Sequence, residues 1–193
     1  MVCLGPRVPG EMVGPRPLSD VVVRPLNFTV RRPMTHFADF SPCTYHSGPF
    51  HADSWECPLL AIGWLEHPND FATGGRLTQD VRDRLAFFRF AFAEAYSPFS
   101  FRGLHDCSLC VAEGLDVRHA WLRDSHVNIL VPGTDCVFIA PGRVDHYVEK
   151  HSYSLPDVFV HALMQCPDPR DSDYEAALLR VNGGRNLPFG ERG

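Results

Sequence analysis

Two cysteines and two histidines constrain the fold of this chain more than any other feature of its sequence. The cysteines form a Cys-x-x-Cys pair, Cys107 and Cys110, and Gly103 shortly before them suggests a turn. Two thiolates at this spacing on a tight turn can point both sulfurs at one ion. His146 and His151 are separated by four residues within an expected helix, a spacing with which two imidazoles share a zinc ion. Together they predict one Zn²⁺ ion bound by all four side chains.

The segments between the cysteines and the histidines indicate the kind of metal unit. Residues 126–131 and 136–140 are short apolar runs typical of strands, and residues 132–135, Pro-Gly-Thr-Asp, have the composition of a hairpin turn. A helix should follow at once with Pro141 as its first residue, because that position needs no amide hydrogen. Knuckle, hairpin and helix in this order predict a treble-clef-like zinc unit. Two sulfur and two nitrogen ligands would close a tetrahedral site, which fits a structural ion better than a catalytic one.

His105 leaves the ligand set open. It lies just before the cysteine pair, where it can replace one helix histidine, support a ligand from outside the site, or only stabilise the turn. We rank its ligand role below those of the two helix histidines. Asp106 and Asp145 are candidates to orient an imidazole, although a solvated carboxylate is the simpler expectation for either.

The remaining periodicities predict an α+β fold. Residues 59–65 are a short apolar run next to prolines, which favours a buried strand. Residues 78–96 repeat apolar side chains at helical spacing, and this aromatic stripe indicates core packing. Further helices are expected at 156–165 and 172–181. We therefore expect a single zinc-binding globular domain over residues 34–193, with a small antiparallel sheet, the zinc unit and C-terminal helices.

Residues 1–33 are expected to form a flexible N-terminal extension. They are dense in Pro, Gly and Arg without sustained periodicity, so they cannot bury enough apolar surface to offset the entropy of ordering. Met34 opens a more regular sequence, which makes it a candidate for the natural start.

The net charge of the chain indicates which classes of partner it can bind, and its cysteines indicate the redox state of its cellular compartment. A formal net charge of -5 gives no electrostatic reason to approach nucleic acid or an anionic membrane, and the apolar runs are far shorter than the ~20 residues that span a bilayer. The cysteines number seven, an odd count, and the first residues lack the apolar stretch of a secretory signal. We expect a reducing, cytoplasmic compartment, where paired cysteines indicate metal ligation before disulfides.

Four stretches of the chain resemble a bacterial domain family without established function. They are residues 39–45 (Asp-Phe-Ser-Pro-Cys-Thr-Tyr), 63–65 (Gly-Trp-Leu), 103–110 (Gly-Leu-His-Asp-Cys-Ser-Leu-Cys) and 146–153 (His-Tyr-Val-Glu-Lys-His-Ser-Tyr). The resemblance runs from about residue 34 to the 170s, and its specific parts are the Gly-x-His-x-Cys-x-x-Cys and His-Tyr-x₃-His phrases. Members of that family usually have Glu where this chain has Ser108. The resemblance implies the same metal site and almost nothing about activity.

A structural-zinc binding or interaction module is the favoured function. A closed metal site would fix the knuckle, hairpin and helix, leaving exposed loops around residues 45–56 and 111–125 to contact an unidentified protein or small molecule. The side chains that we expect to make such contacts are His46, His51, Trp55 and Trp121.

Two catalytic alternatives stay open. In a zinc-dependent hydrolase, His105 and the two cysteines would hold the ion, water would fill the fourth position, and Asp39 or Asp106 would accept its proton. In a thiol enzyme, Cys107 or Cys43 would have a lowered pKa near a histidine. For Cys43 a small buried side chain is the better expectation. A redox Cys-x-x-Cys pair is disfavoured, because the pair does not follow a convincing β-α-β pattern with an active-site helix that begins between the cysteines.

Overall fold

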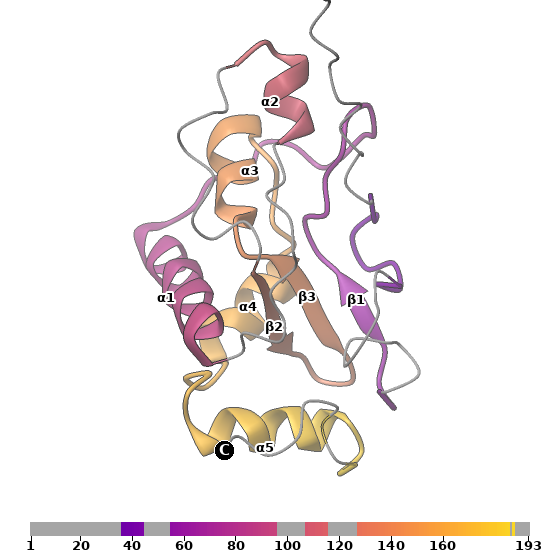
Figure 1. Cartoon of the computed structure of the whole chain (residues 1–193), viewed down its shortest axis with the longest axis vertical. Helices are drawn as coiled ribbons and strands as arrows, with labels where there is room; N and C mark the ends of the chain where they lie inside the picture. The colour runs from indigo at the N-terminus through magenta and orange to yellow at the C-terminus, as the bar shows by residue number, and fades with distance from the viewer. Residues whose placement is uncertain (1–35, 45–54, 96–106, 116–126, 186, 188–193) are drawn as a thin grey trace, which may run out of the picture. The chain divides into compact units, whose positions relative to one another are not determined.

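The computed structural model describes residues 36–44, 55–95, 107–115, 127–185 and 187, and these form an α+β fold, as expected (Figure 1). No helix within these ranges is long and apolar enough to cross a membrane. The predicted extension over residues 1–33 lies outside them. In chain order the elements are β1 (Leu59–Ala61), α1 (Gln79–Ala95), α2 (Ser108–Ala112), β2 (Asn128–Pro132), β3 (Val137–Pro141), α3 (Val144–His151), α4 (Asp157–Gln165) and α5 (Ser172–Val181).

The sheet is mixed, so the prediction of a purely antiparallel sheet is wrong. Its strand order is β1-β3-β2. β2 and β3 form the predicted antiparallel hairpin, with Leu130 opposite Ile139, whereas β1 runs parallel to β3, with Ala61 opposite Ile139. A parallel pair needs a long crossover connection. The chain between β1 and β3 provides it, because it includes α1, α2 and β2.

β1 is shorter than the strand predicted over residues 59–65. After Ala61, Gly63 adopts a φ of 68°, a left-handed conformation that glycine tolerates best. The Ile62 N–H donates to the Ile139 carbonyl at 2.9 Å, and after the turn the Trp64 Nε1–H donates to the same carbonyl at 3.0 Å. The chain therefore turns after Ile62, against the middle of β3, instead of extending the strand.

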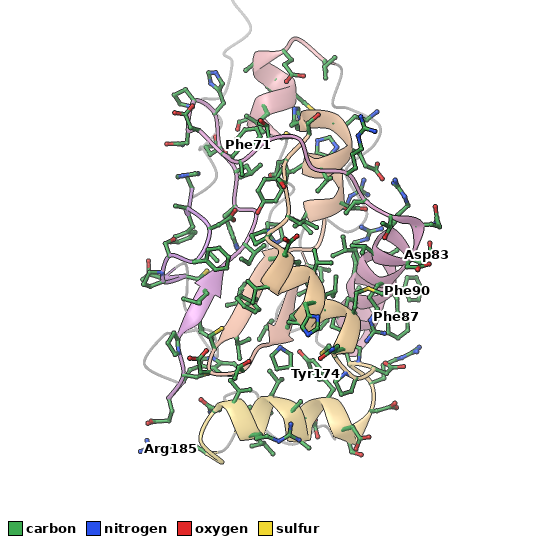
Figure 2. All side chains as sticks on the ribbon, turned by 180° about the vertical axis from the view of Figure 1, so that it is seen from behind. Phe71, Asp83, Phe87, Phe90, Tyr174 and Arg185 are labelled. Carbon is green, nitrogen blue, oxygen red and sulfur yellow. The ribbon has the colours of Figure 1, made fainter. Side chains whose placement is uncertain are left out.

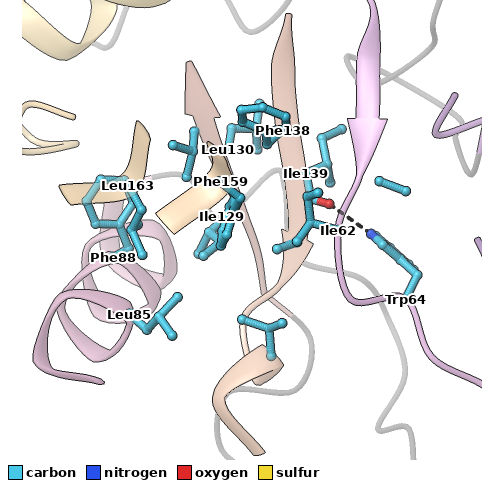
Figure 3. Packing of buried hydrophobic residues seen from close by; sticks show 14 of the residues in the cluster. Ile62, Trp64, Leu85, Phe88, Ile129, Leu130, Phe138, Ile139, Phe159 and Leu163 are labelled. Carbon is cyan, nitrogen blue, oxygen red and sulfur yellow. Dashed lines mark hydrogen bonds between the residues drawn. The ribbon is translucent and has the colours of Figure 1, made fainter. Parts of the chain in front are cut away.

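The hydrophobic core surrounds β3, as Figure 3 shows. Phe159 of α4 meets Phe138 edge to face, with ring centroids 5.9 Å apart. The helical stripe predicted within residues 78–96 also packs in the core, which confirms that prediction; its buried side chains are Val81, Leu85, Phe88 and Phe92.

α5 lies across the end of the sheet beside β2, the outer strand that also contacts α1 and α4. Tyr174, on the side of α5 toward the sheet, is fully buried (Figure 2). Its hydroxyl donates to the Leu130 carbonyl at 2.9 Å. An outer strand has backbone groups without a strand partner, and this bond satisfies one of them.

Arg84 joins α1 to the C-terminal end of α4. Its Nε donates to the Leu163 carbonyl at 3.2 Å, and its Nη2 donates to the Cys166 and Pro167 carbonyls. The guanidinium also lies 4.7 Å from the ring centroid of Phe88. The final carbonyls of a helix lack partners within it, so Arg84 supplies donors from another helix.

Candidate metal centre

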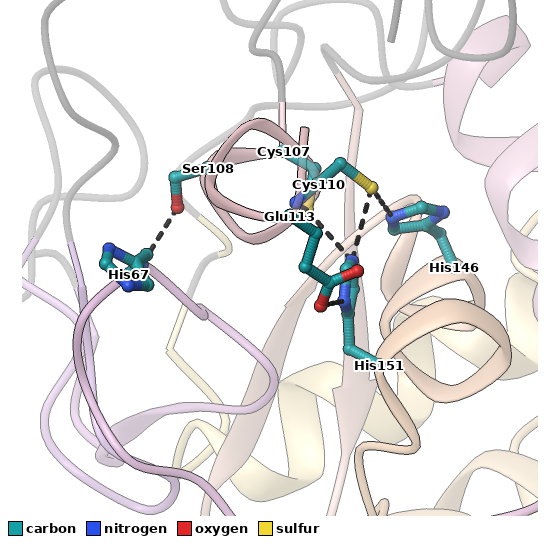
Figure 4. Close-up of polar contacts among 7 residues, drawn as sticks. All are labelled: His67, Cys107, Ser108, Cys110, Glu113, His146 and His151. Carbon is teal, nitrogen blue, oxygen red and sulfur yellow. Dashed lines mark hydrogen bonds and ion pairs between the residues drawn. The ribbon is translucent and has the colours of Figure 1, made fainter. Parts of the chain in front are cut away.

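Cys107, Cys110, His146 and His151 come together in space, as the sequence spacing predicted. Each offers one ligand atom, and all four atoms lie within 4.8 Å of one another. Cys110 Sγ is 3.4 Å from His146 Nε2 and 3.3 Å from His151 Nε2, and Cys107 Sγ is 3.3 Å from His151 Nε2 (Figure 4). The result is a buried Cys₂His₂ group that could hold a metal ion.

The distances within this group fit a tetrahedral ion. Bonds of about 2.3 Å to sulfur and about 2.05 Å to nitrogen at the tetrahedral angle place sulfur and nitrogen ligands roughly 3.6 Å apart. Three of the four sulfur–nitrogen distances are 3.3 to 3.4 Å, only slightly shorter, and no two ligand atoms are more than 4.8 Å apart. Small side-chain movements would therefore accommodate the ion.

A short helix presents the sulfurs, in place of the expected tight turn. Cys107 is the N-cap of α2, with φ −67° and ψ 115°, and its Sγ accepts from the Cys110 N–H at 3.4 Å. This capping bond holds Cys107 Sγ beside the first turn, on which Cys110 lies. Ser108 Oγ accepts from the His67 N–H at 2.9 Å, which ties α2 to the segment after β1 (Figure 4).

The two ends of α3 present the imidazoles. Pro141 is the last residue of β3, where it pairs with Asn128, so the helix begins at Val144 and the prediction of Pro141 as its first residue is wrong. A separation of five residues turns an α-helix by about 500°, which leaves two side chains about 140° apart around its axis. His151, the last residue of α3, nevertheless reaches the group, since its Nε2 lies 3.3 Å from both sulfurs.

Burial keeps three of the four ligand groups, Cys107, Cys110 and His146, neutral when no cation is bound. Burial raises the pKa of Cys107 to about 12 and also raises the pKa of Cys110. Burial, reinforced by the nearby charges of other side chains, lowers the pKa of His146 to about 3. At neutral pH the thiols therefore carry protons that a metal ion must displace, whereas His146 is ready to bind one.

Glu113 contacts one of the two imidazoles, and the sequence did not predict this contact. Its Oε1 lies 3.1 Å from His151 Nδ1. Asp145 pairs with Arg89 at 3.0 Å and its side chain is only 13% exposed, so both its candidate role beside an imidazole and the expected solvated carboxylate are wrong. The sequence spacing could have indicated that Glu113 lies near the group, because it follows Cys110 by three residues and such residues are neighbours on a helix surface.

The other predicted site residues divide into three groups. Trp55 is only 6% exposed and packs in the core, so the expectation that it contacts a partner is wrong. Cys43 is buried, as expected for a small core side chain. The remaining candidates lie outside the described residues; they are His46, His51, His105, Asp106 and Trp121.

Asp39, the other candidate proton acceptor, is engaged elsewhere. Each of its carboxylate oxygens accepts from the Tyr153 hydroxyl at 2.8 Å, and Oδ1 also accepts from the Gly63 N–H at 2.8 Å. These bonds join the turn after β1 to the segment that follows α3. The contacts of Asp39 indicate a structural role.

A groove of about 680 Å³ lies between the hairpin turn, α4 and α5. His161 and Arg180 are among its lining residues, and Cys136 and Cys166 contribute two thiols. Burial raises the pKa of Cys136 to about 11 and that of Cys166 to about 12. Neither thiol is activated as a nucleophile, because the thiolate is the reactive form.

Comparison with known proteins gives one match. A family model described as a domain of unknown function (DUF7919) matches residues 35–164. No curated protein and no solved structure matches the chain. The matched range contains all four residues of the Cys₂His₂ group.

Proposed function

The chain belongs to the DUF7919 family of domains of unknown function, and within that family we propose that it is a structural zinc-binding domain acting as a binding or interaction module. The observation that carries the proposal is the convergence of both cysteine sulfurs on one nitrogen, His151 Nε2, at 3.3 Å each. A neutral imidazole has a single acceptor nitrogen, so two thiol hydrogens cannot both be well satisfied there. One shared cation accounts for both contacts and for the third, between Cys110 and His146.

The donor set supports zinc in particular. Two thiolates and two imidazoles are soft and borderline ligands, and tetrahedral S₂N₂ coordination is typical of structural zinc. The order of α2, the β2–β3 hairpin and α3 supports a treble-clef-like unit. In this proposal the ion holds α2 against α3.

A structural role fits better than either catalytic alternative. Four protein ligands leave no coordination position for water, whereas a catalytic zinc usually has three protein ligands and an open position. The hydrolase alternative also needs a proton acceptor; of its two candidates, Asp39 already binds Tyr153 and Gly63, and Asp106 lies outside the described residues. The thiol-enzyme alternative needs a lowered pKa, whereas burial raises the pKa of Cys107.

A helix does begin between the cysteines, contrary to expectation, but the described element before it is the helix α1 and not a strand. The contacts still favour metal binding, because an imidazole nitrogen lies 3.3 to 3.4 Å from each sulfur. The six cysteines among the described residues are all free, which supports a reducing compartment such as the cytoplasm.

The proposed partner is a protein or a small molecule. The net charge of -5 favours neither nucleic acid nor an anionic membrane. The groove beside α4 and α5 offers a surface of suitable size for a small ligand, since such sites commonly measure about 300–1,000 Å³.

Metal analysis of protein purified without a histidine tag tests the proposal. We expect one zinc per chain in the parent protein and loss of most of it in Cys107→Ser and Cys110→Ser. Cys166→Ser is the matched control, because Cys166 is a buried free thiol outside the group, and it should retain its zinc. A metal-free parent protein, or full zinc in both site variants, would overturn the proposal.

Cobalt substitution separates the structural site from the hydrolase alternative. A closed site should give the intense visible absorption of tetrahedral cobalt, unchanged by small anions that compete for an open position. A spectrum that shifts when such anions are added would favour a catalytic site with exchangeable water.

A further inference from the structure

The geometry points to Glu113 as a positioning residue that fixes His151 as a ligand through Nε2 and so controls how long the ion is retained. This inference rests on the proposed zinc site. It assigns a task to a side chain outside the Cys₂His₂ group.

Glu113 determines which ring nitrogen of His151 faces the two sulfurs. Glu113 Oε1 lies 3.1 Å from His151 Nδ1, while Nε2 of the same ring faces Cys107 and Cys110 at 3.3 Å. A neutral imidazole carries one hydrogen, and a carboxylate accepts it. Glu113 therefore selects the tautomer with hydrogen on Nδ1 and leaves the Nε2 lone pair directed at the sulfurs.

The short helix α2, with its two caps, holds both cysteine sulfurs and the Glu113 carboxylate. Glu113 is the C-cap of α2, and its N–H donates to the Leu109 carbonyl at 3.0 Å. The N-cap of the same short helix is Cys107. α2 and its caps consequently contact both nitrogens of the His151 ring. The direction of Nε2 toward the two sulfurs is therefore set by α2 as well as by α3, the helix that carries His151.

The two side chains of the Glu113–His151 contact differ in their exposure to solvent. The His151 side chain is 2% exposed, whereas the Glu113 side chain is 53% exposed. Solvent or a partner can therefore reach the carboxylate without reaching the ring. A change at Glu113 would alter how the buried ligand is held, and the surface of the domain would thereby influence metal retention.

The test measures the rate of zinc release to an excess of chelator from the zinc-loaded full chain. Loss of a side chain that orients a metal-binding histidine typically weakens metal binding by about 10–100-fold. We expect Glu113→Ala to release zinc about 10–100 times faster than the parent protein. Glu113→Gln should be intermediate, because its amide oxygen still accepts the Nδ1 hydrogen; it is also the variant to use if the alanine variant does not fold.

The matched control is Glu149→Gln. Glu149 is a partly exposed acid on α3 that pairs with Arg82, so this variant should release zinc at the parental rate. A second readout is the His151 tautomer in metal-free protein, measured by nitrogen-15 NMR. We expect hydrogen on Nδ1 in the parent protein and a mixture of tautomers in Glu113→Ala, which a merely structural role of Glu113 would not produce.

The outcomes separate the two proposals. A parent protein that takes up no zinc overturns the proposed function and this inference with it. A parent protein that binds zinc, with Glu113→Ala releasing it at the parental rate or keeping the Nδ1 tautomer unchanged, overturns the role of Glu113 alone.

Discussion

Removal of the ion is expected to destabilise the domain by about 4 kcal/mol. An ion bound by both Cys110 and His151 connects residues 41 positions apart in the chain. If the connection acts as a cross-link on the unfolded chain, the loop-entropy relation used for disulfides gives about 4 kcal/mol at 25 °C for a loop of this length. For a protein of this size, 1 kcal/mol changes the Tm by about 2–4 °C, so the loss should be about 8–16 °C.

Removal of the ion should loosen α2 before it unfolds the whole domain. α2 is short, and its described contacts with the rest of the domain include Ser108 with His67 and Glu113 with His151. The β3 strand instead lies between β1 and β2 in the buried core, which we expect to persist without the ion. We therefore expect the amides of α2 to lose protection first when the metal is removed.

Calorimetry of zinc-loaded and chelator-treated protein measures the change in Tm, and hydrogen exchange followed by mass spectrometry locates it. Cys166→Ser should show the same zinc-dependent shift as the parent protein. A shift below about 2 °C after complete removal of the metal would refute the cross-link argument. Loss of protection in β3 as early as in α2 would refute the claim that the core stands alone.

Three further predictions concern the core, the helix contacts and pH. Tyr174→Phe leaves the buried Leu130 carbonyl without its hydroxyl donor and should lower the free energy of unfolding by about 1–2 kcal/mol in urea titrations. Arg84→Met keeps the apolar stem but removes the donors to the α4 carbonyls, so a similar loss of about 1–2 kcal/mol is expected. Zinc affinity should rise by about 100-fold per pH unit around neutrality, because two thiols with raised pKa values must each release a proton; competition titrations at two pH values measure this.

A specific result would contradict each of these three predictions. Unchanged stability in Tyr174→Phe would show that the hydroxyl contributes nothing. Arg170→Met is the control for Arg84, because Arg170 is 49% exposed and pairs with nearby Asp168; equal losses in the two variants would contradict the helix-end argument. The rise in zinc affinity should persist until the pH passes the pKa of the thiols, and affinity independent of pH would mean that the sulfurs are not the ligands.

Local patterns were enough to predict most helices and the hairpin. The expected helices at 156–165 and 172–181 agree with α4 and α5 to within one residue, because apolar spacing and terminating residues are local signals. The direction of β1 was not predictable in this way. Its register with β3 depends on how the intervening chain, including α1 and α2, crosses the domain.

The candidate site was also only partly accessible from sequence. Ligand spacing predicted that Cys107, Cys110, His146 and His151 would meet, since the spacing within each pair is local. The helical form of α2 was missed, because cysteine is not among the usual N-cap residues. Glu113 was missed because its contact exists only once the end of α3 approaches α2.

The order of donors along the chain has a consequence for biosynthesis. The closest cysteine–histidine pair of the group in sequence is 36 residues apart, Cys110 and His146, and the farthest is 44 residues apart, Cys107 and His151. At translation rates of about 5–20 residues per second, the thiols precede their imidazole partners by about 2–9 s. The nascent chain thus exposes its sulfurs before its imidazoles, and the proposed ion could be enclosed by all four ligands only after α3 has left the ribosome.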